Sequence, residues 1–261
     1  MADAPTVARF TVAGPSSPRL TYALVLAERI HLALVQLSNG SSVFTGCDSS
    51  HKPLQGHRHA HIFCECNEEP GSSSCGEITH VTVYASSGFG RDDLQALQGL
   101  KEVWGCDDPA IRLQLLDLGQ PENFESSSPL LAESRVWVSR TPFVPVRHPK
   151  VTRAGVPKVD ASGLQIGSPE HELVRLLGLA GFPEPVAVER VAGTVLGGRE
   201  AVWREFVCRR NEGKGRRAAY DRGYGFRIEF AEEVRGPVAV GYGEHFGMGG
   251  FESDGPKCID L

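Results

Sequence analysis

The stretch VARFTVAGPSSPRLTYALVLAERIHLALVQL, residues 7–37, decides the fold expected for this chain. Residues 7–12 are a candidate strand, and the proline-bearing turn at 15–18 leads into the apolar segment 20–37. Apolar side chains recur within this segment at helical spacing, at Leu24, Ala27, Ile30, Leu34 and Leu37. The stretch therefore predicts a strand followed by an amphipathic helix.

The chain after this helix predicts a complete β-α-β-β-α-β unit, which we place at residues 1–120. After a polar loop, the expected elements are strands at 59–66 and 78–85, a helix at 91–104 and a strand at 111–118. This is the order of the ferredoxin-like unit, in which four antiparallel strands bury one face under two helices. The other face stays free, and a free sheet face is a common place to bind RNA.

A second unit of the same plan is expected at 130–261, after a polar, proline-bearing linker at 119–129. Its expected elements are a strand at 135–144, a helix at 169–180 and strands at 186–195, 224–231 and 237–241. The basic stretch 209–225 is read as a hairpin loop or a short helix. The predicted fold class is α+β, with two tandem ferredoxin-like units.

The composition is that of a globular protein. Of the 261 residues, 41% are hydrophobic and 23% charged, and the 30 glycines and 17 prolines without a collagen-like period indicate a loop-rich fold. No stretch approaches the roughly 18 to 20 apolar residues of a membrane span, and the first residues do not resemble a signal peptide. We therefore expect a cytoplasmic protein without a membrane partner.

The charge is unevenly distributed. The chain has 27 basic and 32 acidic residues, a net charge of −5, so its overall field repels a nucleic-acid backbone. Basic residues nevertheless gather in two segments, at Arg204, Arg209, Arg210, Lys214, Arg216, Arg217, Arg222 and Arg227, and at Arg140, Arg147, Lys150, Arg153 and Lys158. These segments form either one RNA-binding face or ordinary solvated loops.

Seven cysteines form an odd set without a secretory signal, which favours reduced thiols over a disulfide framework. Cys64, Cys66 and Cys75 lie just after several histidines, so a zinc site is the alternative. Their spacing matches no ordinary zinc finger or ribbon. We assign no metal site and no cofactor from the sequence.

Several segments together resemble a known family. The stretches VFTGCDSSHKPLQGHRHAHIF, EITHVTVYASSGFGRDDLQALQGLKEVWG, VWVSRTPFVPVRHPK and GYGEHFGMGGFES, with the opening strand, resemble the CRISPR-associated RAMP endoribonucleases that cut the repeat. They are similar in particular to the C-terminal half of the fused backbone and endoribonuclease protein of type I-G (formerly I-U) systems. The chain lacks the preceding module of that fusion, and Cys47 follows Thr45-Gly46 where the family often has a histidine.

The resemblance implies a metal-independent endoribonuclease that cleaves precursor CRISPR RNA by attack of a 2′-hydroxyl, leaving a 2′,3′-cyclic phosphate. Histidine best supplies the required base and acid near neutral pH. His57, His59 and His61 alternate, so on one strand they share a face, and His57 is the first choice because it lies nearest the loop. Lys52 or Arg58 would stabilise the developing phosphate charge. His59 and His61 as half-buried sheet residues are the alternative.

The glycine-dense segment 241–250 predicts a loop whose amide groups bind phosphate, or else a structural turn. With the resemblance, the expected RNA-binding residues are Arg58, Arg140, Arg147, His148, Lys150, Arg209, Arg210, Arg216, Arg217, Gly243, His245, Gly247 and Gly249. His80 and Tyr84 are further candidates for the same cleft or for packing. A noncatalytic RNA-binding subunit of a CRISPR effector complex and a zinc-dependent nuclease are the competing functions.

Overall fold

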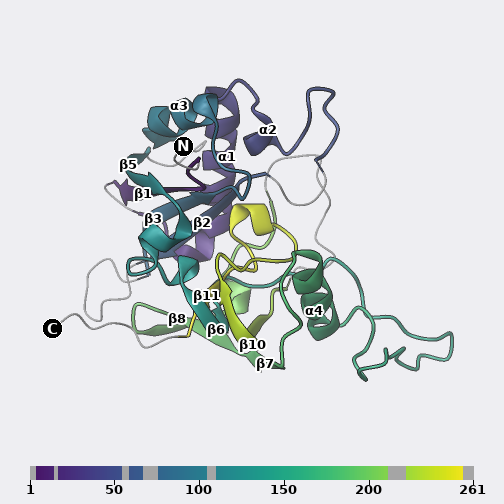
Figure 1. Ribbon diagram of the computed structural model, residues 1–261. Helices are drawn as coiled ribbons and strands as arrows, with labels where there is room; N and C mark the ends of the chain where they lie inside the picture. The colour runs from purple at the N-terminus through teal and green to yellow at the C-terminus, as the bar shows by residue number, and fades with distance from the viewer. Residues whose placement is uncertain are drawn as a thin grey trace.

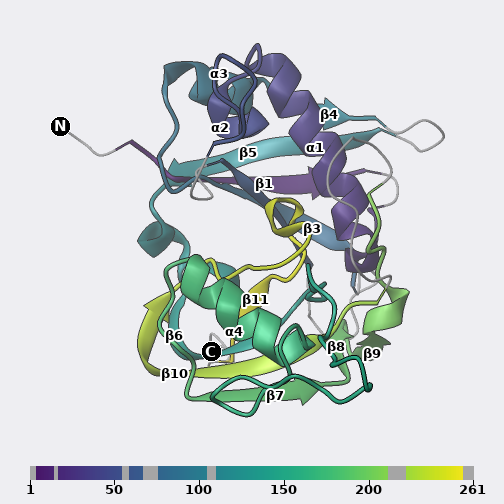
Figure 2. The same cartoon turned by 90° about the vertical axis from the view of Figure 1, so that its right-hand side faces the viewer.

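The computed structural model describes residues 4–14, 17–54, 59–66, 76–104, 110–210 and 222–254 (Figure 1). Two antiparallel sheets lie one above the other, with helices α1 and α3 on the outer side of the first sheet (Figure 2). The first sheet comes from residues before 120 and the second from residues after 132. The division into two domains at this linker stays a prediction.

The first sheet has the strand order β2-β3-β1-β5-β4. Its elements are β1 (Val7–Ala13), α1 (Ala23–Leu37, after the 3-10 helix Leu20–Tyr22), α2 (Ser42–Thr45), β2 (His61–Cys66), β3 (Ile78–Tyr84), α3 (Arg91–Gly99), β4 (Glu102–Val103) and β5 (Ile111–Gly119). Without the short β4, this is the order of a ferredoxin-like unit. The expected strand and helix at residues 7–37 are confirmed, and Leu24, Ile30 and Leu34 of α1 are fully buried in the core.

The helix expected at 91–104 is shorter in the structure. It ends at Gly99, and Leu100 has an extended backbone with φ −73° and ψ 101°. Glycine weakens a helix, and the chain then turns so that Leu100 is buried in the core. Val103 pairs with Ile111 of β5, which makes the residues expected as the last helical turn an additional edge strand.

The second sheet has the order β11-β6-β10-β7, again that of a ferredoxin-like unit. Its elements are β6 (Glu133–Ser139), α4 (Pro169–Leu179), β7 (Ala187–Val191), β10 (Gly225–Arg235) and β11 (Phe251–Ser253), with the separate hairpin β8 (Gly193–Leu196) and β9 (Arg199–Val202). Ser168 caps α4 by accepting the His171 amide, as its position before Pro169 favours. The α+β class and the double ferredoxin-like plan are confirmed.

Two expected strands of this unit are wrong. The strand at 186–195 divides at a bend before Gly193, where a Cβ would lie 2.4 Å from the Ala201 carbonyl oxygen, and the second part pairs with β9 instead. The strand at 237–241 is a loop that only bridges Gly250 through Ala239. The last strand, Phe251–Ser253, lies beyond the glycines and pairs with β6.

The segment 236–250, here called the glycine loop, takes the place of the second helix of the second unit. It carries only the 3-10 helix η5 (Glu244–Phe246), and in Figure 2 it lies as a yellow coil between the two sheets. Gly247 has φ +73°, and a Cβ there would lie 2.7 Å from the Ile62 carbonyl oxygen of β2. Only glycine allows so close an approach in this conformation, and the contact brings the loop onto edge strand β2.

A buried ion pair fastens the free face of the first sheet to the linker. Arg9 of β1 pairs with Glu65 of β2 at 3.2 Å and donates to the Ser127 carbonyl at 3.0 Å. Glu65 also accepts the hydroxyls of Thr82 and Ser128, at 2.6 and 2.5 Å. These bonds satisfy both carboxylate oxygens, so the linker covers this end of the face and leaves the His61 end for another segment.

The helix segment Leu20–Leu37 corrects one expectation from composition. It is long and apolar enough to cross a membrane by length and hydropathy, and half of it is buried inside the protein. Its buried side chains, among them Leu20, Leu26 and Ala27, belong to the core of the first unit. Packing in that core accounts for its apolar character.

We expect Gly247→Ala to destabilise the protein more than Gly155→Ala. Both glycines have positive φ, +73° and +79°, so both variants carry a similar backbone strain of about 1–2 kcal/mol. Nothing lies within 4 Å of a Cβ at Gly155, whereas at Gly247 it meets the backbone of β2. Urea unfolding should show an extra loss of roughly 1–3 kcal/mol for Gly247→Ala, typical of overpacking. Equal losses would contradict the close seating of the loop.

Candidate active site

The alternation of β2 places His61 on the free face of the first sheet. Ile62 and Cys64 are buried in the core beneath the helices, so His61 and Phe63 point to the other side. His61 pairs with Tyr84 of β3 across the ladder. The His61 and Tyr84 ring centroids are 6.5 Å apart.

The glycine loop brings a second imidazole to the same place. Helix η5 is flanked by Gly243 and Gly247, both at positive φ, which lets the chain make one tight turn over β2. Glu244 and His245 lie in this turn, with His245 Nε2 3.7 Å from Glu244 Oε1. The other carboxylate oxygen of Glu244 accepts the Gly241 amide at 3.1 Å, which fixes the orientation of the carboxylate.

His59, His61 and His245 form one group, which we call the imidazole cluster. The ring centroid of His245 lies 3.2 Å from that of His59 and 4.1 Å from that of His61, and the His59 and His61 centroids are 6.4 Å apart. His59 precedes β2 rather than lying in it, and it packs against Gly46, where a Cβ would come within 3.0 Å of its ring. The β2 region and the glycine loop, which are far apart in the sequence, thus meet at this point.

His61 of the cluster lines a cavity of about 180 Å³ between the first sheet and the end of α4. His61, Tyr84 and Glu244 line it on one side, and Leu179 and Ala180 at the end of α4 line the other. Burial, followed by the charge of Glu122, raises the pKa of Tyr84. The Tyr84 hydroxyl therefore keeps its proton at neutral pH and serves as a hydrogen-bond donor.

Arg210 is a basic residue that contacts the segment next to His245. Its guanidinium lies over the Phe246 ring, 4.2 Å from the centroid, and pairs with the buried Glu28 of α1. Phe246 follows His245 directly, so this arginine is held next to the loop by a cation–π contact and an ion pair. Burial lowers the pKa of the neighbouring His31, and the charge of Arg210 lowers it further. A hydrogen bond to the backbone of Phe44 acts in the opposite direction.

The other predicted site residues are distributed as follows. His57, Arg58, Arg216 and Arg217 lie outside the described residues. Lys52 is exposed in a turn closed by Asp48, in the loop that continues from Gly46. Exposed positions are also found for Arg147, His148, Lys150 and Arg209. RNA contact by these residues stays a prediction.

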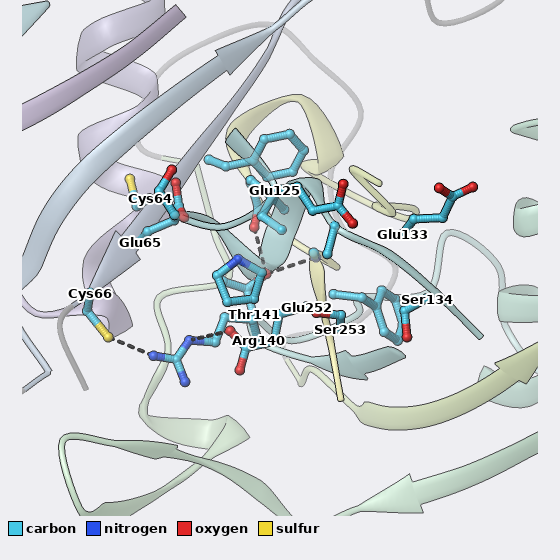
Figure 3. Close-up of a pocket in the computed structure, with 18 of the residues that line it drawn as sticks. Cys64, Glu65, Cys66, Glu125, Glu133, Ser134, Arg140, Thr141, Glu252 and Ser253 are labelled. Atoms are coloured by element: carbon cyan, nitrogen blue, oxygen red, sulfur yellow. Dashed lines mark hydrogen bonds and ion pairs between the residues drawn. The ribbon is translucent and has the colours of Figure 1, made fainter. Parts of the chain in front are cut away.

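The side chain of Arg140 is buried among other protein groups and is hardly exposed at the surface. It is 9% exposed, and its guanidinium donates to the Val195 carbonyl at 2.8 Å and to the Cys66 sulfur at 2.7 Å (Figure 3). Glu252 lies 3.6 Å away, and burial raises the pKa of this glutamic acid although Arg140 lowers it. Arg140 thus ties β6 to β2, β8 and β11, and a role in RNA binding stays a prediction.

A cavity of about 460 Å³ lies beside Arg140, lined partly by Glu65, Glu125, Glu133 and Glu252 (Figure 3). Its lining holds four glutamates against one arginine, Arg140, so it offers a phosphate few favourable contacts. The smaller cavity at His61 therefore suits phosphodiester chemistry better.

Cys64 and Cys66 lie apart from the imidazole cluster. Cys64 is buried against α1 and donates to the Ala23 carbonyl at 3.7 Å, while Cys66 contacts Arg140. Burial raises the pKa of both thiols, so neither is readily a thiolate ligand. Cys75 lies outside the described residues. The expected alternative of a zinc site built from Cys64 and Cys66 with these histidines is wrong for the described part of the chain.

The glycine loop does not form the expected phosphate nest at Gly247 and Gly249. The Gly247 amide donates to the Glu244 carbonyl at 3.0 Å, and the Gly249 amide donates to the Pro142 carbonyl at 3.0 Å. At Gly249 a Cβ would lie 2.0 Å from the Val240 carbonyl oxygen. These glycines serve close backbone packing, which places His245 next to β2. RNA contact by Gly243 and His245 stays a prediction.

His80 shares the sheet face of His61 but lies at its other end. It pairs with Glu65, four residues along β2 from His61, which corresponds to about 13 Å. It hydrogen-bonds Thr79 and lies near Arg9. His80 therefore belongs to the ion-pair end of the face and not to the imidazole cluster.

Sequence reasoning undervalued the residues of the glycine loop. The sequence pattern does not single out Glu244, and it predicts RNA contact for His245. The signal was present in GYGEHFG, where an acid and a histidine stand between glycines at 243 and 247. Such a tight turn points adjacent polar side chains at a neighbouring element, but the sequence does not reveal which element that is.

Solved structures are similar to the chain over nearly its whole length at low identity. One is described as a RAMP protein binding different RNA substrates, with 11% identity, coverage of 96% of this chain and 99% of that chain, and a TM-score of 0.44. Another is the product of a Cas6-related gene from Pyrococcus furiosus, with 12% identity, 95% and 98% coverage and a TM-score of 0.43. A third is a CRISPR associated protein Cas6, with 7% identity, 96% and 98% coverage and a TM-score of 0.42.

No protein-family model and no curated sequence matches the chain significantly. The assignment of the fold therefore rests on the strand order of the two sheets and not on these structural likenesses.

The stability of the protein should fall as the pH drops below about 6.5, and His80→Gln should reduce this fall. Burial, followed by the charge of Arg9, lowers the pKa of His80 although Glu65 opposes this. Because the unfolded chain then binds a proton more readily than the folded one, stability is complete above the unfolded pKa and is lost on acidification. Urea unfolding at pH 7.5, 6.5 and 5.5 should show a shallower slope for the variant. Identical slopes would contradict the shift.

Proposed function

We propose that this chain is a metal-independent endoribonuclease that cleaves precursor CRISPR RNA within the repeat. The observation that carries the proposal is the meeting of His61 and His245, 4.1 Å apart by ring centroids, beside the cavity that Tyr84 also lines. Imidazoles perform both proton transfers of RNA transesterification near neutral pH. The sequence resemblance to repeat-cutting RAMP proteins, including the type I-G fusion, supports the choice of substrate.

The cluster favours a mixed protonation state. Imidazolium rings at such short distances repel one another, so a neutral ring beside a charged one is the favourable arrangement. Glu244, whose carboxylate lies 3.7 Å from His245 Nε2, stabilises the charge on His245. His61 is then the neutral ring, and His59 stacks on His245 from the other side.

The reaction assigns one proton transfer to each ring. Neutral His61 accepts the proton of the ribose 2′-hydroxyl, whose oxygen attacks the adjacent phosphorus. The bond from phosphorus to the 5′-oxygen breaks, and His245 donates its proton to that oxygen. The products are a 2′,3′-cyclic phosphate and a free 5′-hydroxyl.

Charge on the phosphate is stabilised by donors around the cavity. The Tyr84 hydroxyl is protonated, and Tyr84 lies next to His61 on the same sheet face, where its hydroxyl can donate to a nonbridging oxygen. Arg210 adds positive potential from its position over Phe246. Lys52 and the exposed basic residues are proposed to hold the flanking RNA by its phosphates.

Repeat RNA should be cut by the protein in excess EDTA, and His61→Ala and His245→Ala should each slow single-turnover cleavage by about 10²–10⁴-fold. Repeat affinity should change only a few fold, because a proton carrier and not a phosphate contact is lost. His80→Gln is the matched control, a histidine on the same sheet face, and should cut at the native rate. An RNA with a 2′-deoxyribose at the cut site should stay intact.

Tight binding of an RNA that stays intact in EDTA would contradict the enzyme and favour a noncatalytic RNA-binding subunit. If His61→Ala and His245→Ala both cleave at the rate of the native protein, the active site lies elsewhere. His57→Ala belongs in the same series, because the sequence makes His57 the first candidate. Loss of cleavage in that variant alone would move the proton transfer to the segment before His59.

A further inference from the structure

We propose that His61, Glu244 and His245 form a binding site for a divalent transition-metal ion of the zinc class, and that the bound ion blocks cleavage. One ligand atom from each of the three residues lies within 4.8 Å of the others. Two imidazoles and a carboxylate are a common ligand set for zinc, with an open fourth position. The second part of this inference rests on the proposed function.

The distances are close to those of a coordinated ion. In a tetrahedral zinc site with ligand bonds of about 2.0–2.1 Å, neighbouring ligand atoms are about 3.3 Å apart. His245 Nε2 and Glu244 Oε1 are 3.7 Å apart, so this pair needs only a small contraction. The His61 ligand atom lies within 4.8 Å of the other two, so this side chain must move closer by about 1.5 Å at most for an ion to bind.

The backbone holds the three ligands in place before any ion binds. His61 lies on β2, paired along its length with β3. Glu244 and His245 lie in a turn held between two positive-φ glycines and seated on β2 through Gly247. The Gly241 amide donates to the second oxygen of Glu244 at 3.1 Å, a bond that orients one lone pair toward the site.

The charge balance also favours a cation of this kind. A divalent ion takes the place of the proton on His245, and the carboxylate of Glu244 offsets part of its charge. Imidazole ligands select zinc, copper, nickel and cobalt over magnesium and calcium, which prefer oxygen. The cavity of about 180 Å³ beside His61 and Glu244 leaves room for water at the open position.

A bound ion should inhibit the proposed reaction because it occupies the same lone pairs. His61 cannot accept the 2′-proton while its nitrogen is coordinated, and His245 cannot hold the proton for the leaving oxygen. A zinc ion and the protons transferred in the reaction therefore compete for the same nitrogen atoms of His61 and His245. Cleavage should be fastest in chelator and should fall as the site fills.

The metal site is tested without any activity assay, by titrating chelator-treated, desalted protein with Co²⁺ and recording the visible spectrum. We expect one ion per chain with the absorption of a low-coordinate nitrogen and oxygen site, and without near-ultraviolet thiolate absorption. His61→Ala and His245→Ala should each weaken binding at least about tenfold, as expected when a ligand is removed. His80→Gln should bind like the native protein, and Mg²⁺ should not compete.

Absence of binding, a thiolate band, or unchanged binding in both histidine variants would overturn the site. In a parallel assay, Zn²⁺ added to protein that cuts in EDTA should stop cleavage at the concentration that fills the site. Cleavage that persists or rises with the site full would overturn the inhibitory role. If the protein binds the ion but never cuts, the proposed function fails and the metal site stands.

Discussion

The contact between Gly247 and the Ile62 carbonyl is the constraint on which the rest of the site depends. Strand β2 lies at the edge of the first sheet, and an edge strand leaves backbone groups open to other partners. In this protein the glycine loop of the second unit covers that edge, and the absence of a side chain at Gly247 sets how closely it approaches. The imidazole cluster and its cavity exist because this approach is so close.

A second constraint is the placement of charge in a protein that is acidic overall. Two arginines from the basic segments have opposite environments: Arg140 is enclosed by Cys66, Val195 and Glu252, while Arg210 lies over Phe246 at the cluster. The first fastens strands together, and the second joins the glycine loop to α1 through Phe246 and Glu28. The number of arginines in a segment is therefore less informative than which acidic and aromatic groups hold each one.

The sequence predicted most of the first unit and part of the second. Periodicity sufficed for α1, β1 and α4, because local apolar spacing governs them. Periodicity failed at Gly193, whose backbone lies against Ala201. It also failed at residues 237–241, where the backbone of Gly249 lies against Val240. These contacts join residues that only the folded chain brings together.

For the site, the sequence located the histidines of the β2 region but not their partner. His61 was a candidate because it alternates with its neighbours, whereas His59 lies before the strand and reaches the group by packing on Gly46. His245 and Glu244 join the group through the docking of one unit on the other. Local sequence patterns do not predict which segment of the other unit the glycine loop contacts.

The distance along the chain between the two halves of the cluster has a consequence for folding. His61 and His245 belong to opposite units, so neither half can hold the group alone. Displacement of the glycine loop would disperse the cluster, and it would also expose Val238, Val240 and Met248, which are buried in the folded protein. The proposed cleavage would then depend on the position of the glycine loop on β2. A chain with all its helices and strands formed, but with this loop displaced, would not cleave RNA.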